Sequence, residues 1–311
     1  MKRLFYVFLM CILLTGCAKE AEPAQQTLFA MDTVMDLRVW GKDADVGIGR
    51  IVSTLTTLEA NWSATDEKSV LSGINKGQNI VLDVYSSSML VKADRLSERT
   101  GGAFDPRLGA LMELWGFYDK DYCVPTDSEI GEALKQTQLD LGGALKGYAG
   151  QECADLLKEL DVDCAILNLG GNIQTYGSKP GGEPWQIGIQ NPEGGGSIGI
   201  LSVEGTVSIV TSGDYQRYFE ENGKKYHHIL DPETGYPVES GLRSVTVIGR
   251  DGMTADALST ALFVMGLEEA AEFWRESEDF DAVFVLSDGQ VFATEGAHLS
   301  GCVYEVIRRE E

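Results

Sequence analysis

The sequence predicts an α+β fold in a single domain over residues 28–311, preceded by a cleaved export signal and a short tether. Two observations predict this class. Segments with the two-residue alternation of strands and segments with helical spacing both occur, and they are intermixed without the regular alternation of a doubly wound sheet. In addition, no low-complexity linker and no internal repeat interrupts the chain after Thr27.

The first residues have the pattern of an export signal. Two basic residues precede an apolar run over 4–14, which is too short for a stable membrane anchor. The run ends in "LTGC", which is similar to a bacterial lipobox, whose cysteine becomes the lipid-bearing first residue. We therefore expect residues 1–16 to be removed, Cys17 to anchor the protein in the cell envelope, and residues 17–27 to form a tether. The alternative is an ordinary signal with a chance cysteine.

The first half of the domain mixes strands and helices. Residues 31–41 alternate as a strand does, and residues 44–60 place apolar residues at helical spacing. A second helix is predicted over 86–102, because the glycine pair at its end can close it. In the segment 101–117, "GGAFDPRLGALMELWGF", most residues predict an apolar helix that packs into the core with Leu108, Leu111, Met112 and Trp115.

The second half contains most of the strands. A helix is predicted over 147–160, and "CAILNLGGNIQTYG" (164–177) predicts a strand, a Gly-Gly turn and a second strand. A long helix is predicted over 254–274. The remaining strand candidates are short apolar or alternating runs at 185–190, 197–203, 207–211, 243–249, 281–286 and 290–294.

Two adjacent histidines lie between two predicted turns. Asn222-Gly223 in "FEENGKKY" is a strong hairpin signal, and "DPETG" (231–235) is a second tight turn. His227 and His228 stand on the strand between them, and neighbouring strand residues point to opposite faces. We therefore expect one histidine to face a cleft and the other to face solvent. The alternative is a strand histidine that bonds a nearby carboxylate.

Asp256 and Thr260 are four residues apart on the predicted helix and therefore share a face. A carboxylate and a hydroxyl one turn apart offer two hard oxygens to Mg²⁺, which takes waters and phosphate oxygens at its other positions. The alternative for Asp256 is a favourable interaction with the helix dipole.

Two glycine-rich segments resemble phosphate-binding loops without matching them. "LDLGGALKGYAGQ" (139–151) leads into a helix whose N–H groups can meet anions. It is not a Walker A loop, because Tyr148 stands where lysine is required. "LGGN" (169–172) lacks the third glycine and the following helix of a dinucleotide fingerprint. Neither nucleotide-binding fold is supported.

The charge balance limits the partners. Without the signal the chain has 23 basic and 48 acidic residues, a net charge of −25, which repels nucleic acid. A polyanionic substrate therefore needs a local metal ion or backbone N–H groups. The four cysteines of the domain lack metal-type spacing, and buried thiols are favoured over disulfides: Cys123, Cys153, Cys164 and Cys302.

Nine short motifs occur together in a characteristic order. They are "FAMDTVM", "LSGIN", "TGGAFDP", "LWGF", "LDLGGALKGYA", "NLGGN", "TSGDYQRYF", "HHILDPETGYPV" and "ADALSTALFVMG". From about Phe29 to Gly266 or beyond, the chain thereby resembles the ApbE family, the FAD:protein FMN transferases. The resemblance implies that a threonine or serine hydroxyl of a target protein attacks Mg²⁺-bound FAD, that FMN is attached through a phosphoester, and that AMP leaves. An exported or membrane redox subunit is the expected target, because such a subunit faces the same side of the membrane as the enzyme.

The resemblance also implies roles for individual residues. Asp256, Thr260 and the main-chain carbonyl of Leu145 would hold Mg²⁺. His228 would lie near the phosphates and accept the proton of the attacking hydroxyl, with His227 as its outward-facing neighbour. The FAD pocket would be lined by Met31, Trp62, Ala103, Phe104, Asp105, Gly142, Tyr148 and His228. The alternatives are a Mg²⁺-dependent FAD pyrophosphatase that yields FMN and AMP, and a non-catalytic flavin-binding lipoprotein.

Overall fold

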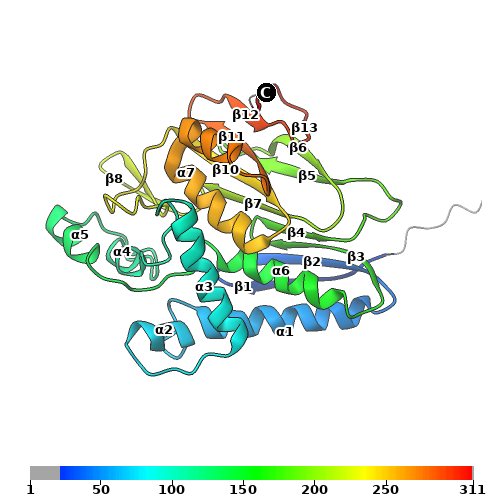
Figure 1. Ribbon diagram of the computed structural model, residues 1–311, viewed down its shortest axis with the longest axis horizontal. Coiled ribbons are helices and arrows are strands. Elements are labelled where there is room, and N and C mark those ends of the chain that lie inside the picture. Colours follow the sequence, from blue (N-terminus) through cyan, green and yellow to red (C-terminus); the bar gives the residue numbers. More distant parts are fainter. Residues whose placement is uncertain (1–21, 310–311) are drawn as a thin grey trace, which may run out of the picture.

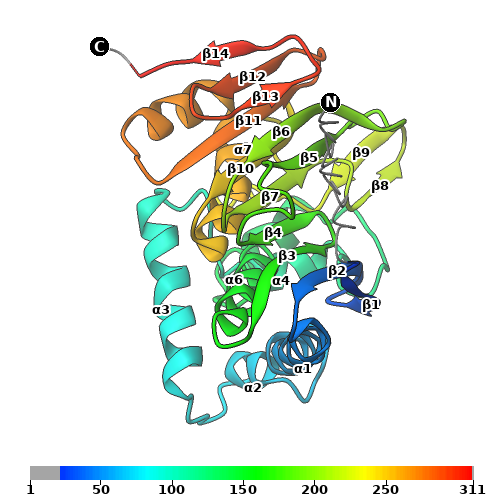
Figure 2. The same ribbon diagram turned by 90° about the vertical axis from the view of Figure 1, so that its right-hand side faces the viewer.

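A nine-stranded sheet forms the centre of the computed structural model, which describes residues 22–309. In order across the sheet, its strands are β1 (Ala24–Ala30), β2 (Thr33–Gly41), β3 (Val162–Leu169), β4 (Asn172–Tyr176), β7 (Ser208–Gly213), β10 (Leu242–Gly249), β11 (Phe280–Leu286), β12 (Val291–Thr294) and β14 (Glu305–Ile307). Neighbours pair antiparallel, except that β12 and β14 are parallel. Figure 2 shows the strands stacked from β1 and β2 below to β14 at the top.

Two smaller sheets and a set of helices surround the central sheet. The three-stranded sheet consists of β13 (Leu299–Ser300), β6 (Ser197–Val203) and β5 (Trp185–Gln190), and the hairpin consists of β8 (Tyr218–Glu221) and β9 (Lys224–His227). The helices are α1 (Ala44–Trp62), α2 (Val70–Asn75), α3 (Val84–Arg99), α4 (Gly109–Leu114), α5 (Asp127–Ala133), α6 (Leu145–Leu157) and α7 (Gly252–Arg275). This mixture confirms the predicted α+β class.

The central sheet is covered differently on its two faces. Along β3, the side chains of Ala165, Leu167 and Leu169 pack in one core with α1 and α6. The alternate residues Cys164 and Ile166 belong to a second core, which the three-stranded sheet forms against the opposite face. The period of two along the strand therefore places helices on one face and a small sheet on the other, as Figures 1 and 2 show.

The N-terminal boundary differs from the prediction. Residues 24–27, expected in the tether, belong to β1 and pair with β2, for example Thr27 with Asp36. Met31 and Asp32, expected to open a strand, form the β1–β2 turn at positive φ values of 51° and 58°. The predicted signal peptide 1–16 and the lipidation site Cys17 lie outside the described residues. Among residues 22–309, no helix combines the length and the apolar character needed to cross a membrane.

At one end of the molecule lie α4, α5 and the β8–β9 hairpin (Figure 1). An aromatic core joins them. Trp115 is fully buried, as predicted, and its Nε1 donates to the carbonyl of Gly235 at 2.9 Å. Phe219 and Tyr226 stack across the hairpin at 5.2 Å between ring centroids. The predicted Asn222-Gly223 turn has the expected positive φ values, 52° and 77°. These contacts fix the segment that continues into His228.

The remaining predictions concern α7 and the cysteines. The predicted helix 254–274 is present, but Gly266 interrupts it with a φ of 79°. All four described cysteines are free thiols, and Cys153 and Cys164 are buried as favoured by the sequence, whereas Cys123 is exposed.

Candidate active site

A cavity opens between the start of α6, the N-terminal half of α7 and the loop that follows α3. Its empty volume, including the space open to solvent at the mouth, is about 760 Å³. The site residues predicted from the sequence that line it are Ala103, Phe104, Asp105, Gly142, His228, Asp256 and Thr260. The lining also contains residues that sequence reasoning missed, among them Asp140, Gly143, Lys146, Asn172, Ser212 and Arg217.

Asp256 is a buried carboxylate without a cationic partner. It is 4% exposed, and its Oδ2 accepts the backbone N–H of Gly147 at 2.7 Å. Within residues 22–309, the other carboxylate oxygen accepts no hydrogen bond, and no lysine, arginine or histidine forms an ion pair with Asp256. Burying an unpaired charge is costly. A cation in the cavity would offset that cost, so the residue fits the predicted metal-binding role.

Close contact between α6 and α7 leaves the carbonyl of Gly143 without its helical hydrogen-bond partner. A Cβ on Gly147 would lie 2.0 Å from the Gly252 carbonyl oxygen, so only glycine allows this approach. Because the Gly147 N–H donates to Asp256, it does not serve the carbonyl of Gly143 four residues earlier, as a helical ladder would. Gly143 also lies beside Thr260, since a Cβ there would be 3.4 Å from the Thr260 Oγ1.

The main-chain carbonyl of Leu145 stays a predicted Mg²⁺ ligand. Leu145 is the first residue of α6 and lines the pocket that adjoins the cavity with Asp256 and Thr260. Gly143, which lines that cavity, offers a second candidate main-chain carbonyl.

A chain of hydroxyl groups keeps the Thr260 oxygen available. The Ser259 hydroxyl donates to the carbonyl of Asp256 at 2.8 Å, so it accepts from the Ser212 hydroxyl, also at 2.8 Å. Because Ser212 has only one hydroxyl proton and donates it to Ser259, it must accept the proton of the Thr260 hydroxyl, 3.3 Å away. Thr260 uses its proton in this chain and keeps its lone pairs for a ligand. Carboxylate, hydroxyl and carbonyl oxygens together suit a hard cation such as Mg²⁺.

His228 has one ring nitrogen bound and the other free. Its Nδ1 lies 3.1 Å from the carbonyl oxygen of Arg217, which can only accept, so Nδ1 carries the proton. Nε2 is then the unprotonated acceptor. Burial holds the pKa of His228 well below its usual value of 6.5, and the nearby Arg217 guanidinium lowers it further. The imidazole is therefore neutral at physiological pH and can accept a proton at Nε2.

The expected position of His227 was wrong. The two histidines do point to different sides, but His227 is 7% exposed and packs edge-to-face against Phe263, rather than facing solvent. Its Nε2 bonds the carbonyl of Val238 at 3.0 Å. The segment is covered on both sides, so the rule that one strand face meets water does not apply here.

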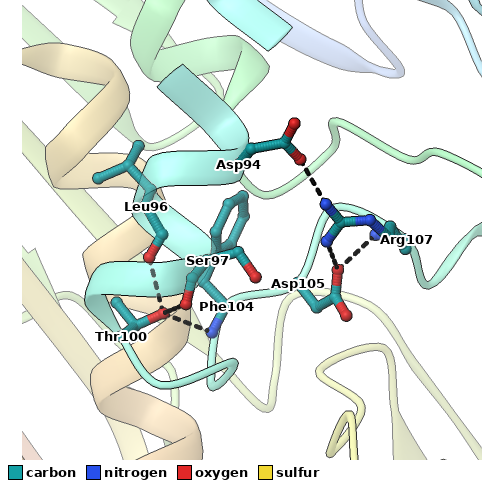
Figure 3. A network of polar contacts seen from close by, with 7 residues as sticks. All are labelled: Asp94, Leu96, Ser97, Thr100, Phe104, Asp105 and Arg107. Atoms are coloured by element: carbon teal, nitrogen blue, oxygen red, sulfur yellow. Dashed lines mark hydrogen bonds and ion pairs between the residues drawn. The ribbon is translucent and has the colours of Figure 1, made fainter. Parts of the chain in front are cut away.

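The loop that carries Ala103, Phe104 and Asp105 is held at both ends (Figure 3). Thr100 donates its hydroxyl to the carbonyl of Leu96 at 2.9 Å and accepts the N–H of Phe104 at 3.2 Å. On the other side, Arg107 bridges Asp94 of α3 and Asp105, with its Nη1 3.1 Å from the Asp105 Oδ1. These bonds fix the cavity wall and neutralise Asp105.

A second pocket continues from the cavity. Its empty volume is about 1170 Å³, and it contains the predicted residues Met31 and Trp62 together with Leu145. Asp140, Gly142 and Arg217 line both spaces, so the two adjoin. Asp140 accepts the Gly142 N–H at 2.6 Å and the Tyr118 hydroxyl at 3.0 Å. An elongated ligand can therefore extend from Asp256 to Trp62.

Tyr148 lies apart from these two spaces. It is half-buried on α6 and belongs to neither lining. Burial and the adjacent Glu152 carboxylate raise its pKa to about 12, so its hydroxyl stays protonated. Its predicted contact with FAD stays a prediction.

The sequence also matches known proteins. The model of the ApbE family matches residues 31–284. The chain belongs to the ApbE family. A relative named FAD:protein FMN transferase from Treponema pallidum is 32% identical over 323 aligned positions, which cover 90% of this chain and 89% of that protein.

Solved structures of other ApbE proteins have the same fold. The ApbE protein of Thermotoga maritima superposes with a TM-score of 0.82 at 34% identity, covering 88% of this chain and 97% of that one. The flavin transferase ApbE from Vibrio cholerae gives 0.78 at 26% identity, covering 88% and 97%. The predicted family and its mixed fold are thereby confirmed.

Proposed function

We propose that this protein is a FAD:protein FMN transferase that attaches FMN through a phosphoester to a threonine or serine of a target protein and releases AMP. The decisive observation is the arrangement of the cavity, in which the unpaired Asp256 carboxylate and the Thr260 hydroxyl lie in one lining with the neutral His228. Family membership and the names of the relatives support the same activity.

The protein groups prepare the cavity for a diphosphate. Asp256, Thr260 and a main-chain carbonyl, that of Leu145 or of Gly143, would hold Mg²⁺, which when bound neutralises charge on the FAD pyrophosphate and orients it. Lys146 and Arg217 also line the cavity and supply positive charge for phosphate oxygens. The two adjoining spaces accommodate the two ends of FAD, with Met31 and Trp62 in one lining and Phe104 in the other.

The reaction exchanges one phosphoryl ester for another. The hydroxyl oxygen of the acceptor attacks the phosphorus of the FMN half and forms a new P–O bond, while the P–O bond to the bridging oxygen breaks. AMP leaves with that electron pair. The acceptor proton passes to Nε2 of His228, which is free because Nδ1 donates to Arg217. No water is consumed.

The test is the mass of an acceptor. The protein is incubated with FAD, Mg²⁺ and an exported redox domain that contains a candidate threonine. We expect a product heavier by one FMN residue and an equal amount of AMP. An unchanged acceptor with free FMN and AMP would instead identify a FAD pyrophosphatase. Intact FAD would identify a flavin-binding protein without catalysis.

Metal binding gives a first prediction. Asp256→Asn keeps an oxygen for the Gly147 N–H but removes the charge, so activity should fall by at least about 10²-fold. Without metal, the variant should melt no lower than wild type, because an unpaired buried charge is gone. In thermal melts, Mg²⁺ should raise the melting temperature of wild type and leave that of the variant unchanged. Equal shifts for both proteins would contradict the assignment.

We also propose that the protein is anchored at the cell envelope through Cys17 and acts on exported or membrane redox subunits. The "LTGC" sequence supports the anchor. Replacement of Cys17 by alanine should release the protein from the membrane fraction. Retention of the variant in that fraction would contradict the lipid anchor.

A further inference from the structure

Asn172 is a buried polar side chain of the cavity that has no partner in the protein. It is 5% exposed and lines the same space as Asp256 and Thr260. Within residues 22–309, its Nδ2 is buried and makes no hydrogen bond. Buried amide NH₂ groups are normally paired, so this unpaired donor is unusual. The reaction outlined above assigns no role to it.

The fold fixes Asn172 in this position. It is the first residue of β4, directly after Gly170 and Gly171, whose φ values are 71° and 97°. Asn168 holds the turn, because its Oδ1 accepts the Gly171 N–H at 2.9 Å. A Cβ on Gly170 would lie 2.2 Å from the Thr33 Oγ1, so the turn also packs against β2. The "NLGGN" motif thus holds the Asn172 amide at a fixed position in the cavity wall.

A neighbouring amide shows the contrast. Gln174 lies two residues along β4, on the same side of the strand, and is also buried. Its Oε1 accepts the Ser208 hydroxyl, and its Nε2 donates to the Thr175 carbonyl at 2.9 Å. The structure satisfies the Gln174 amide at both ends and leaves the NH₂ group of Asn172 without a partner. Only the unsatisfied amide lines the cavity.

We propose that Asn172 is a further catalytic residue of the proposed FMN transfer, in which its side-chain NH₂ donates to a non-bridging phosphoryl oxygen of FAD. Rotation about the last side-chain bond can turn the NH₂ group toward the cavity without breaking a protein hydrogen bond. Phosphoryl oxygens only accept, so they require the donor end of the amide. A neutral donor beside Asp256 also adds no charge that competes for the cation.

The hydrogen bond from Asn172 would stabilise the transition state more than bound FAD. Charge is distributed over the non-bridging oxygens of the transferring phosphoryl group, and fixed donors directed at them lower the barrier. Asn172 transfers no proton, so the balance of bonds is that of the proposed reaction. Loss of the donor should therefore reduce kcat more than it raises KM for FAD.

The experiment compares three variants in the acceptor-labelling assay. Asn172→Leu removes the donor and Asn172→Asp replaces the amide by an anion. We expect kcat to fall by about 10²-fold in the first and further in the second, with KM for FAD changed less than threefold. The control Asn168→Asp makes the same chemical change in the same turn but keeps an oxygen for the Gly171 N–H. It should retain the wild-type kcat.

Thermal melts separate catalysis from folding. Asn172→Leu should melt at or above the wild-type temperature, because it removes an unsatisfied buried amide. A kcat within twofold of wild type in both Asn172 variants would overturn the inference, and so would a kcat loss shared by Asn168→Asp. If the wild type and both Asn172 variants are active, the inference about Asn172 fails but the proposed function still holds. An inactive wild type would overturn the proposed function and this inference together.

Discussion

Whether a donor or acceptor atom already has a hydrogen-bond partner in the protein decides the chemistry of the residues in this cavity. His227 and His228 are adjacent, but His227 lies in an apolar core and bonds Val238, whereas His228 has a free Nε2 at the cavity. The spacing of Asp256 and Thr260 on one helical face was predictable, because it depends only on the helical period. The unpaired carbonyl of Gly143 could not be predicted. It loses its helical hydrogen-bond partner through a contact between two helices, which no local sequence pattern encodes.

The lowered pKa of His228 predicts an unusual pH profile. The imidazole stays neutral below pH 6.5, so the acid limb of kcat/KM should lie below 6.5. Arg217→Gln keeps the backbone carbonyl that holds Nδ1 but removes the guanidinium, so the limb should move toward 6.5. Arg217→Lys, which keeps the charge, is the control. Initial rates with saturating Mg²⁺ measure the profile, and a wild-type limb above 6.5 would contradict it.

The same pKa has a consequence for stability. Between the folded pKa of His228 and 6.5, the unfolded chain binds a proton that the folded protein excludes. The contribution of His228 to the free energy of unfolding is therefore complete above pH 6.5 and decreases as the pH falls toward the folded value.

Among the elements, the contact between α6 and α7 holds the site together. The glycines at 147 and 252 allow the two backbones to meet, and the contact directs the Gly147 N–H to Asp256. Helix positions were largely predictable because their apolar periods are clear. Strand β1 was not, because most of its residues are exposed, and its edge position leaves little alternation to detect. The short helices α2 and α5 also have too few turns to show a period.

Replacement of one glycine tests this contact. In Gly147→Ala, the new Cβ would be 2.0 Å from the Gly252 carbonyl oxygen and 2.6 Å from the Asp256 Cβ. The helices must separate, so the free energy of unfolding should fall by about 1–3 kcal/mol in urea titrations. The stabilisation by Mg²⁺ should also disappear.

The control for that variant is a helical glycine with open space around it. A Cβ on Gly49 of α1 would meet no atom within 4 Å, so Gly49→Ala should stabilise the protein by up to about 1 kcal/mol. If Gly147→Ala kept both the wild-type urea midpoint and the Mg²⁺ response, the close helix contact would not be needed for the site.

On the scale of the whole molecule, a bound cation would make the cavity oppose the field of the protein. The chain carries a net charge of −23. The cavity lining sets Lys146 and Arg217 against Asp105, Asp140 and Asp256, so the opposition depends on the cation that the cavity is proposed to hold. The sheet makes this possible because β4 and β7 bring Asn172 and Ser212 beneath α7, so residues distant in sequence surround one small volume. An approaching dinucleotide is repelled at long range and attracted only near the cavity.

The long-range repulsion between the acidic protein and FAD predicts that added salt increases kcat/KM for FAD. The screening length is about 10 Å at 0.1 M ionic strength, so added salt weakens the distant repulsion more than the contacts inside the cavity. With free Mg²⁺ held constant, kcat/KM for FAD should rise by about twofold or more between 0.02 and 0.2 M ionic strength, while kcat changes little. Steady-state rates in an inert salt measure this effect. A kcat/KM that falls steadily with salt would mean that the local charges of the cavity, rather than the acidic surface, control the approach of the substrate.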